Sequence, residues 1–164
     1  MKFFFLYALL FTLYINTAPS TETGIDVYIR KSLYKNHQGK KVGLISNQTG
    51  VNKDLVPTLE VLLTNGINIS AIFSPEHGWN GNGYADEKMS NGKIGEIPLF
   101  SLYGSNRRPG KEMLKGLDLL IYDIQDIGVR SYTYITTLFY VMEEAAKNKI
   151  PVVVMDRPNP INGI

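Results

Sequence analysis

The feature that most constrains the fold is an apolar run that ends abruptly in polar residues, and it occurs four times. The runs are residues 42–46, 67–73, 117–122 and 152–155. Their length and aliphatic composition predict strands, and residues 117–122, apolar apart from Asp118, are typical of a central strand buried on both faces. Helical segments separate the runs. The sequence therefore predicts an α/β fold, a Rossmann-like three-layer sandwich with a mainly parallel sheet.

Two segments with helical spacing lie before the second strand. Residues 24–34 predict a short helix whose inward side chains are Ile25, Tyr28, Ile29 and Leu33. Asp54 is expected to cap the next helix, with Pro57 in its first turn and Gly66 just past its end. The inward stripe of this second helix is expected to be Leu55, Leu59, Leu62 and Leu63. Both helices are expected to cover the sheet.

The second half of the chain adds a long loop, an edge strand and two helices. Residues 75–98 are glycine-rich and polar, and long loops of this kind are usually functional or mobile. Residues 99–103 are expected to form a short edge strand, and Pro109 to begin a brief helix that ends near Gly116. Ser131 is expected to cap the last helix. The inward side chains of that helix are expected to be Ile135, Leu138, Phe139 and Met142.

Polar residues follow all four strands, and these exits carry the candidate site. In an open parallel sheet, ligands bind beyond the carboxyl ends of the strands, where the strand order reverses. The exit residues are Asn47 and Gln48 after the first strand, Ser74, Glu76 and His77 after the second, Asp123, Gln125, Asp126 and Arg130 after the third, and Asp156, Arg157 and Asn159 after the fourth. Tyr132 and Tyr134 begin the last helix, close to the same crevice.

Glu76 and His77 are the most conspicuous of these residues because they lie between Pro75 and Gly78. Proline fixes its own φ and restricts the residue before it, while glycine permits a turn that other residues resist. The two titratable side chains should therefore be held at the carboxyl end of a strand. The alternative is a plain turn with two solvated polar residues.

Composition and motifs exclude several classes of function. The formal charge is +2 and the Lys and Arg residues are scattered, so we expect no nucleic-acid partner, which usually needs a clustered basic face. No glycine-rich phosphate-binding motif follows a strand, so we expect neither a dinucleotide nor a nucleoside triphosphate. The chain has no cysteine, which excludes disulfides, thiolate catalysis and cysteine-based zinc sites.

Residues 1–20 are arranged like a secretory signal peptide. Lys2 supplies a positive charge, residues 3–15 are largely apolar, and Ala18-Pro19-Ser20 is the preferred cleavage sequence. The apolar stretch is shorter than the about 20 residues that a membrane span needs, so we expect no stable membrane span. We expect a secreted or periplasmic protein. An uncleaved amino-terminal anchor is the alternative.

Five stretches in register resemble one family, the exo-β-N-acetylmuramidases of the NamZ type, formerly a domain of unknown function. The stretches are residues 42–51 (VGLISNQTGV), 73–78 (FSPEHG), 98–104 (PLFSLYG), 123–128 (DIQDIG) and 156–160 (DRPNP). Arg130 and residues 132–134 (YTY) match as well. The order and spacing of these stretches fit the family over residues 24–163.

The resemblance implies a glycoside hydrolase that releases N-acetylmuramic acid from the non-reducing ends of peptidoglycan fragments, in cell-wall turnover or recycling. It implies that residues 24–164 form a Rossmann-like catalytic domain without a cofactor. The implied partner is a peptidoglycan-derived sugar, either a muropeptide or the disaccharide of N-acetylmuramic acid and N-acetylglucosamine. Family members carry a second, β-rich carboxyl-terminal domain that closes the cleft. We expect this chain to lack that domain, which could be encoded separately.

Glycoside hydrolysis usually needs one carboxyl group as acid and a second as base or nucleophile, about 5 to 9.5 Å apart. We expect Glu76 to be the acid, assisted by His77, and either Asp123 or Asp126 to be the second group. The residues expected to bind the sugar are Asn47, Gln48, Ser74, Gln125, Arg130, Tyr132, Tyr134, Arg157 and Asn159. Arginine suits the anionic lactyl group. An ion-pair and capping network is the alternative role of Asp123, Asp156 and Arg157.

Three other interpretations stay open. The chain could be a truncated, non-catalytic remnant that binds muropeptides without turnover. Glu76, His77, Asp123 and Asp126 could hold a divalent metal, although no H-E-x-x-H spacing supports this. Ser74 and His77 could form a nucleophile pair, although no G-x-S-x-G elbow surrounds Ser74.

Overall fold

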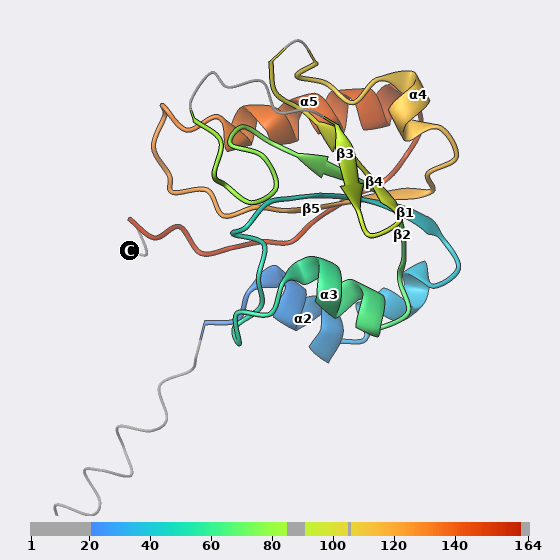
Figure 1. Ribbon diagram of the computed structural model, residues 1–164. Coiled ribbons are helices and arrows are strands. Elements are labelled where there is room, and N and C mark those ends of the chain that lie inside the picture. Colours follow the sequence, from blue (N-terminus) through green and yellow to red (C-terminus); the bar gives the residue numbers. More distant parts are fainter. Residues whose placement is uncertain (1–20, 85–90, 105, 162–164) are drawn as a thin grey trace, which may run out of the picture.

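The computed structural model describes residues 21–84, 91–104 and 106–161, and a six-stranded sheet organises them (Figure 1). The strands are β1 (Lys41–Ser46), β2 (Asn68–Ser74), β3 (Gly92–Ile94), β4 (Ile97–Ser101), β5 (Leu119–Asp123) and β6 (Val152–Val154). The order across the sheet is β3-β4-β2-β1-β5-β6, and all neighbouring pairs are parallel except β3 and β4. The predicted α/β fold with a mainly parallel sheet is confirmed.

Helices cover both faces of the sheet, which is the middle of three layers (Figure 1). On one face lie α2 (Gly24–Arg30), the 3-10 helix η1 (Leu33–His37) and α3 (Thr58–Thr64), and on the other lie α4 (Lys111–Leu114) and α5 (Tyr134–Lys147). Each face has its own core. One core includes Ile25, Tyr28, Leu44, Leu62 and Ile72, and the other includes Phe73, Leu120, Tyr122, Val141 and Ala145.

The strand order reverses between β1 and β5. From β1 the chain moves outward to β2 and β4, and it then returns past β1 to β5 and β6. Because these strands are parallel, their carboxyl ends lie at one edge of the sheet, and the register pairs Ser46 with Asp123 at the ends of β1 and β5. The polar residues that follow the parallel strands therefore leave the sheet at this one edge.

The sheet has one strand that the sequence analysis missed. Residues 92–94 form β3, which pairs antiparallel with β4 and places Lys93 opposite Pro98. β4 lies between β2 and β3, so the prediction of an edge strand over residues 99–103 was wrong in position, and the strand begins earlier, at Ile97. A three-residue strand that starts with glycine offers too little alternation of apolar and polar residues to be recognised.

The helix before β2 begins later than expected. α3 starts at Thr58 with Pro57 at its N-cap, so the prediction that Asp54 caps it was wrong. The Asn52 side-chain oxygen accepts hydrogen bonds from the backbone of Asp54 and Val56 instead, which holds this segment in a turn. Leu55 and Leu63, both expected inward, are exposed as a result, and only Leu59 and Leu62 are buried.

The first helix is shorter than expected. α2 ends at Arg30, because Ser32 adopts a φ of 56°, which a right-handed helix excludes. The chain then continues as η1, and Leu33 is exposed rather than inward.

The last helix turns a different face to the sheet than the one expected. Its N-cap residue is Thr133, without the predicted Ser131 cap. Its buried residues are Tyr134, Thr137, Val141 and Ala145. Of the four residues expected inward, Leu138 is partly buried against the core, whereas Ile135, Phe139 and Met142 are 60%, 57% and 49% exposed. The prediction was wrong because two stripes with helical spacing run along this helix, and the more apolar one was chosen.

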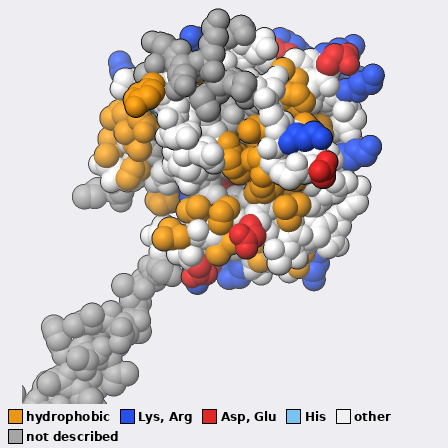
Figure 2. All heavy atoms as spheres, in the orientation of Figure 1, with side chains coloured by type: hydrophobic (Ala, Val, Ile, Leu, Met, Phe, Trp, Pro, Cys, Tyr) orange, Lys and Arg blue, Asp and Glu red, His pale blue; other side chains and the backbone are white. Residues whose placement is uncertain are grey.

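The expected signal peptide, residues 1–20, lies outside the described residues, as do residues 85–90 of the long loop. Among the residues that the structure does describe, no helix is both long and apolar enough to cross a membrane. On the face drawn in Figure 2, Lys and Arg side chains are scattered and mixed with Asp and Glu.

Candidate active site

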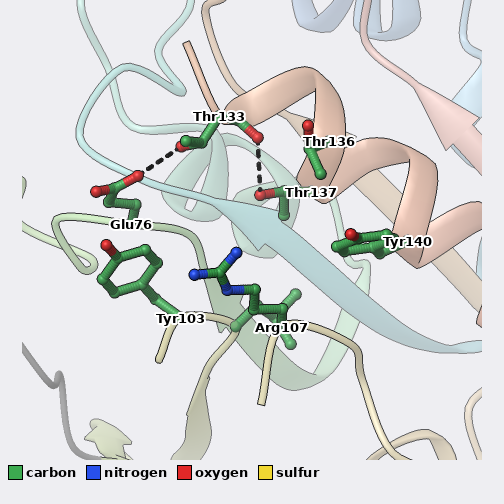
Figure 3. Close-up of a pocket in the computed structure, with 8 residues that line it drawn as sticks. Glu76, Tyr103, Arg107, Thr133, Thr136, Thr137 and Tyr140 are labelled. Carbon is green, nitrogen blue, oxygen red and sulfur yellow. Dashed lines mark hydrogen bonds between the residues drawn. The ribbon is translucent and has the colours of Figure 1, made fainter. Parts of the chain in front are cut away.

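Glu76 lies on a tight turn at the carboxyl end of β2. The Gly78 backbone N–H donates a 3.0 Å hydrogen bond to the Pro75 carbonyl, and His77 and Gly78 have positive φ angles of 68° and 76°. A positive φ is uncommon outside glycine, so this turn holds the backbone in a sparsely populated conformation. Thr133, just before α5, donates a 2.8 Å hydrogen bond from Oγ1 to Glu76 Oε2 (Figure 3).

Two hollows meet at Glu76. The first, the Arg107 hollow, has a volume of about 230 Å³ and is lined by Glu76, Leu102, Tyr103, Arg107, Thr133, Thr136, Thr137 and Tyr140 (Figure 3). The second, the Tyr132 hollow, has a volume of about 300 Å³ and is lined by Glu76, His77, Ser131, Tyr132, Thr133 and Tyr134. Glu76 and Thr133 line both, and among the described residues Glu76 is the one carboxylate in either lining.

His77 holds the loop that follows it. Its Nδ1 lies 2.9 Å from the Gly83 carbonyl oxygen, and the Gly83 backbone N–H donates a 3.1 Å hydrogen bond to the His77 carbonyl. A carbonyl can only accept, so Nδ1 donates in this contact, and the His77 side chain also lines the Tyr132 hollow. Gln48 is exposed and lies against the same loop, since a Cβ at Gly81 would come within 2.2 Å of its side chain.

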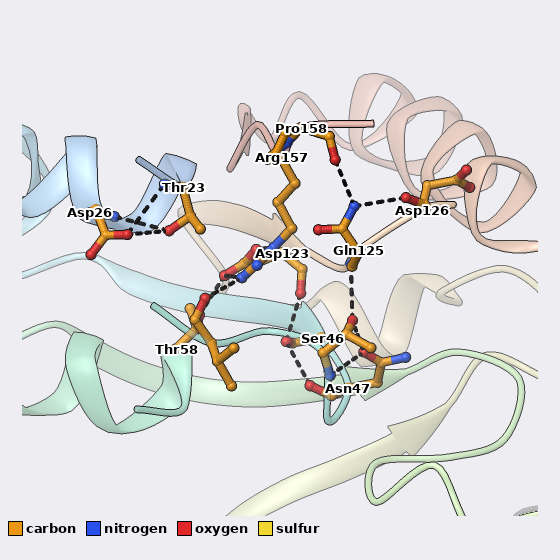
Figure 4. A network of polar contacts seen from close by, with 12 residues as sticks. Thr23, Asp26, Ser46, Asn47, Thr58, Asp123, Gln125, Asp126, Arg157 and Pro158 are labelled. Atoms are coloured by element: carbon orange, nitrogen blue, oxygen red, sulfur yellow. Dashed lines mark hydrogen bonds and ion pairs between the residues drawn. The ribbon is translucent and has the colours of Figure 1, made fainter. Parts of the chain in front are cut away.

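Asp123 is fully buried in an ion pair with Arg157, whose side chain is 7% exposed (Figure 4). Arg157 donates from Nε to Oδ1 over 2.6 Å and from Nη2 to Oδ2 over 3.0 Å, and Thr58 donates a further hydrogen bond to Oδ2. Burial raises the pKa of the Asp123 carboxyl, against the opposing effect of Arg157 and Thr58. This geometry is the ion-pair network described as the alternative role of Asp123 and Arg157. Asp156, the third member of that alternative, has an exposed side chain.

Gln125 and Asp126 hold the exits of β5 and β6 together. Gln125 Nε2 donates to the carbonyls of Asp126 and Pro158 over 2.7 and 2.9 Å (Figure 4). Asp126 Oδ1 accepts a 2.6 Å hydrogen bond from the Gly128 backbone. Asp126 Oδ2 is buried and has no hydrogen-bond partner among the described residues. A buried carboxylate oxygen without a partner is costly, so it marks a position where a ligand group or water can bind.

Asn47 presents a second unpaired polar atom at the exit of β1. Its Oδ1 accepts hydrogen bonds from the backbone and hydroxyl of Thr49, over 3.0 and 2.6 Å. Its Nδ2 is buried, and no acceptor among the described residues lies in hydrogen-bond geometry with it. Burial raises the pKa of Tyr134. The Asn47 amide interacts with the Tyr134 hydroxyl and opposes that rise.

The remaining predicted site residues differ in how they meet the hollows. Tyr132, 36% exposed, contacts the buried Tyr134 edge to face, with ring centroids 5.1 Å apart. Ser74 is buried at the end of β2 and lines neither hollow. Arg130 and Asn159 are exposed and line neither hollow; Asn159 Oδ1 accepts a 3.1 Å hydrogen bond from the Ile161 backbone.

Sequence reasoning missed most of the Arg107 hollow. Tyr103, Arg107, Thr133, Thr136, Thr137 and Tyr140 line it, yet none was among the predicted site residues. The spacing of Thr133, Thr136 or Thr137, and Tyr140 follows one face of a helix, which could have indicated them. The arginine pair at 107 and 108 was the other available indication. In the part of the chain that the structure describes, no three His, Cys, Asp or Glu side chains gather as a metal site would require.

Comparison with known proteins relates the chain to one group. The family model described as "Exo-beta-N-acetylmuramidase NamZ, N-terminal" matches residues 42–164. The peptidoglycan β-N-acetylmuramidase NamZ of Bacillus subtilis (strain 168) is 44% identical over 149 residues, which are 88% of this chain and 36% of the relative.

Two solved structures have the same fold. Both are DUF1343 family proteins from Bacteroides fragilis NCTC 9343, with TM-scores of 0.75 and 0.69 and identities of 45% and 34%. The match covers 87% of this chain and 36% of each of those chains, so the chain spans about a third of the length of its relatives. The chain belongs to the NamZ exo-β-N-acetylmuramidase family, and its residues 42–164 correspond to the amino-terminal domain of that family.

Proposed function

We propose that this chain forms the acid-bearing part of a cell-wall glycosidase that releases N-acetylmuramic acid from the non-reducing ends of peptidoglycan fragments. The observation that carries the proposal is the position of Glu76 at the boundary of two hollows. A glycosidase binds a sugar on each side of the bond that it breaks and brings a carboxyl group to the oxygen between them. The relationship to the B. subtilis peptidoglycan β-N-acetylmuramidase supports the substrate class.

Glu76 is the general acid in this proposal. Its Oε2 accepts the hydrogen bond from Thr133, which leaves Oε1 to carry the proton that passes to the leaving oxygen. The Thr133 contact also restricts the rotamer of Glu76, so the proton is held between the two hollows. His77 acts by fixing the loop, since its Nδ1–H is bonded to Gly83.

Asp126 is the second catalytic group in this proposal. Asp123 is less suited to proton transfer because both its oxygens are bonded and its side chain is fully buried. Asp126 Oδ2 is also buried and Asp126 lines neither hollow, but this oxygen has no hydrogen-bond partner among the described residues, so of the two carboxylates it is the one that can accept a hydrogen bond from a water.

Sugar binding is assigned to the groups that the fold leaves unsatisfied or accessible. Asn47 Nδ2 can donate to a substrate oxygen, and the Tyr132 ring offers an apolar face to a sugar. Tyr134, which lines the Tyr132 hollow, and the exposed Gln48 and Arg130 complete the proposed set, whereas the buried Ser74 is given no sugar contact. Gln125, Arg157 and Asn159 are given an indirect role: their side chains hydrogen-bond to the backbone of the segments after the strands and so position the residues that contact the sugar. A peptidoglycan substrate also requires a secreted or periplasmic location, which the composition of residues 1–20 supports.

The experiment is release of the chromophore from nitrophenyl β-N-acetylmuraminide by the wild-type chain, Glu76→Gln and Glu96→Gln. Glu96, with a side chain 97% exposed, is a matched control that lines neither hollow. Glu76→Gln is expected to lower kcat by about 10²- to 10⁴-fold, the usual contribution of a general acid, and Glu96→Gln to leave it unchanged.

Undiminished turnover in Glu76→Gln would exclude Glu76 as the acid. Binding of the sugar by a folded wild-type chain that never releases the chromophore would instead favour the muropeptide-binding function without catalysis. Since the chain spans 36% of the length of its relatives, the activity of this part by itself is the quantity that the experiment measures.

A further inference from the structure

We propose that Arg107 binds the lactyl carboxylate of N-acetylmuramic acid and thereby makes the Arg107 hollow selective for the acidic sugar. This inference rests on the proposed function, because it names the group by which that site would recognise its substrate. It assigns the non-reducing sugar to the Arg107 hollow and the next sugar to the Tyr132 hollow.

The Arg107 hollow carries charges of opposite sign. The guanidinium of Arg107 projects into it from the loop after β4, and the Glu76 carboxylate lies beside Thr133 (Figure 3). Among the described residues, no ion pair joins Arg107 to Glu76 or to another carboxylate, and the guanidinium carbon lies 6.0 Å from the centroid of the Tyr103 ring. A guanidinium without a carboxylate partner in a hollow suits an anionic ligand.

The other arginines of the chain are less suited to this role. Arg30 and Arg157 are held in ion pairs with Glu22 and Asp123, and Arg130 lines neither hollow. Arg108 pairs with Glu143 and Glu144 and lies over the Tyr140 ring, 3.9 Å from its centroid. Arg108 therefore fixes Tyr140 in the wall of the hollow, while its neighbour Arg107 is left to meet a ligand.

The rest of the lining suits a single sugar. Thr136, Thr137 and Tyr140 line it from one face of α5, and Thr137 and Tyr140 bring hydroxyl groups (Figure 3). Leu102 also lines it and offers an apolar surface. The volume of about 230 Å³ is below the usual range of about 300 to 1,000 Å³ for ligand sites, which leaves room for one sugar unit rather than an oligosaccharide. An anion bound at Arg107 would orient that sugar with its glycosidic bond toward Glu76.

The experiment compares equilibrium binding of free N-acetylmuramic acid and of its neutral methyl ester, measured by calorimetry or by ligand-observed NMR. The proteins are the wild-type chain, Arg107→Gln, Arg107→Lys and the control Lys111→Gln, which removes one charge from an exposed residue outside the hollow. The wild type is expected to bind the acid about 10- to 100-fold more tightly than the ester, the usual range for a hydrogen bond between charged groups. Arg107→Gln should abolish that preference, Arg107→Lys should keep part of it, and Lys111→Gln should keep all of it.

The inference is overturned if Arg107→Gln retains the preference for the acid, if the wild type binds acid and ester equally, or if neither ligand binds the folded wild-type chain. Because these are binding measurements, they separate this inference from the proposed function. A chain that prefers the acid through Arg107 but never hydrolyses the muraminide keeps the inference and loses the catalytic proposal.

Discussion

At the scale of single residues, burial divides the charged side chains of the crevice into two groups. Asp123 and Arg157 are bonded to each other beneath the strand ends, where removal of one partner would leave a buried charge uncompensated. Glu76 and Arg107 line a hollow that is open to a ligand. The sequence could not separate the groups, because Glu76, Asp123 and Arg157 all follow a strand and differ only in what the fold places around them.

His37 gives a prediction for the pH dependence of stability. Its Nδ1 lies 2.6 Å from the Tyr28 hydroxyl, and burial, together with the charge of Lys40, lowers the pKa of His37 from its ordinary value of 6.5. The unfolded chain therefore takes up a proton at a higher pH than the folded chain does. The free energy of unfolding should fall as the pH drops below 6.5, until the pH passes the folded-state pKa.

Urea unfolding of the wild type and His37→Gln between about pH 7.5 and 5.5 checks this prediction. The variant is expected to lose less stability than the wild type over that interval, because glutamine takes up no proton where the His37 imidazole does. Parallel pH profiles of the two proteins would contradict a contribution from His37.

At the scale of elements, the sequence predicted what each segment forms better than which way it faces. The strands at residues 41–46, 68–74, 119–123 and 152–154 agree with the apolar runs to within two residues at each end, because a buried parallel strand must be apolar along its length. Which face of a helix packs on the sheet was harder to predict from the sequence. In α5 the sheet covers Thr137, Val141 and Ala145, whereas the larger Ile135, Phe139 and Met142 face outward, and only the packed sheet decides between these stripes.

The two faces of α5 should respond differently to substitution. Val141 is fully buried, so Val141→Ala is expected to lower the free energy of unfolding by about 2 kcal/mol, from two lost methyl groups and the space that they leave. Phe139 is 57% exposed, so Phe139→Gln should change it by no more than about 0.5 kcal/mol. Chemical denaturation of both variants measures the difference. An equal loss in the two would mean that the outward stripe is also packed.

At the scale of the whole molecule, the site is a product of chain topology. The four polar exits predicted that polar side chains gather at one edge of a parallel sheet, but the strand order that brings Ser46 opposite Asp123, at the ends of β1 and β5, came only from the structure. The hydrogen bond between Glu76 and Thr133 joins residues 57 positions apart, and it depends on the turn after β2 and the start of α5 reaching the same place. No local pattern encodes such a meeting: the helical spacing of Thr133, Thr137 and Tyr140 could indicate one wall of the Arg107 hollow, but not that this wall lies beside Glu76.

Gly50 is the position at which the packing between the ends of β1 and β5 can be tested. A Cβ at Gly50 would lie 2.1 Å from Ser46 Oγ and 2.8 Å from the Asp123 carbonyl oxygen, the two groups that join the ends of β1 and β5 through a 2.7 Å hydrogen bond. Because one of these neighbours is backbone and the other is buried, neither can move freely, and Gly50→Ala is expected to cost about 1 to 3 kcal/mol, as overpacking typically does.

Gly92→Ala is the matched control, since a Cβ at Gly92 would have nothing within 4 Å. The same glycine-to-alanine change there should be neutral or slightly stabilising, because alanine restricts the unfolded chain. Urea unfolding compares the stability of the two variants. Binding of N-acetylmuramic acid by folded Gly50→Ala then tests whether the packing between the ends of β1 and β5 also sets the shape of the site. Equal stability of the two variants would mean that the strand ends separate without cost, and the crevice at the reversal of strand order would not be the rigid support that the proposed chemistry needs.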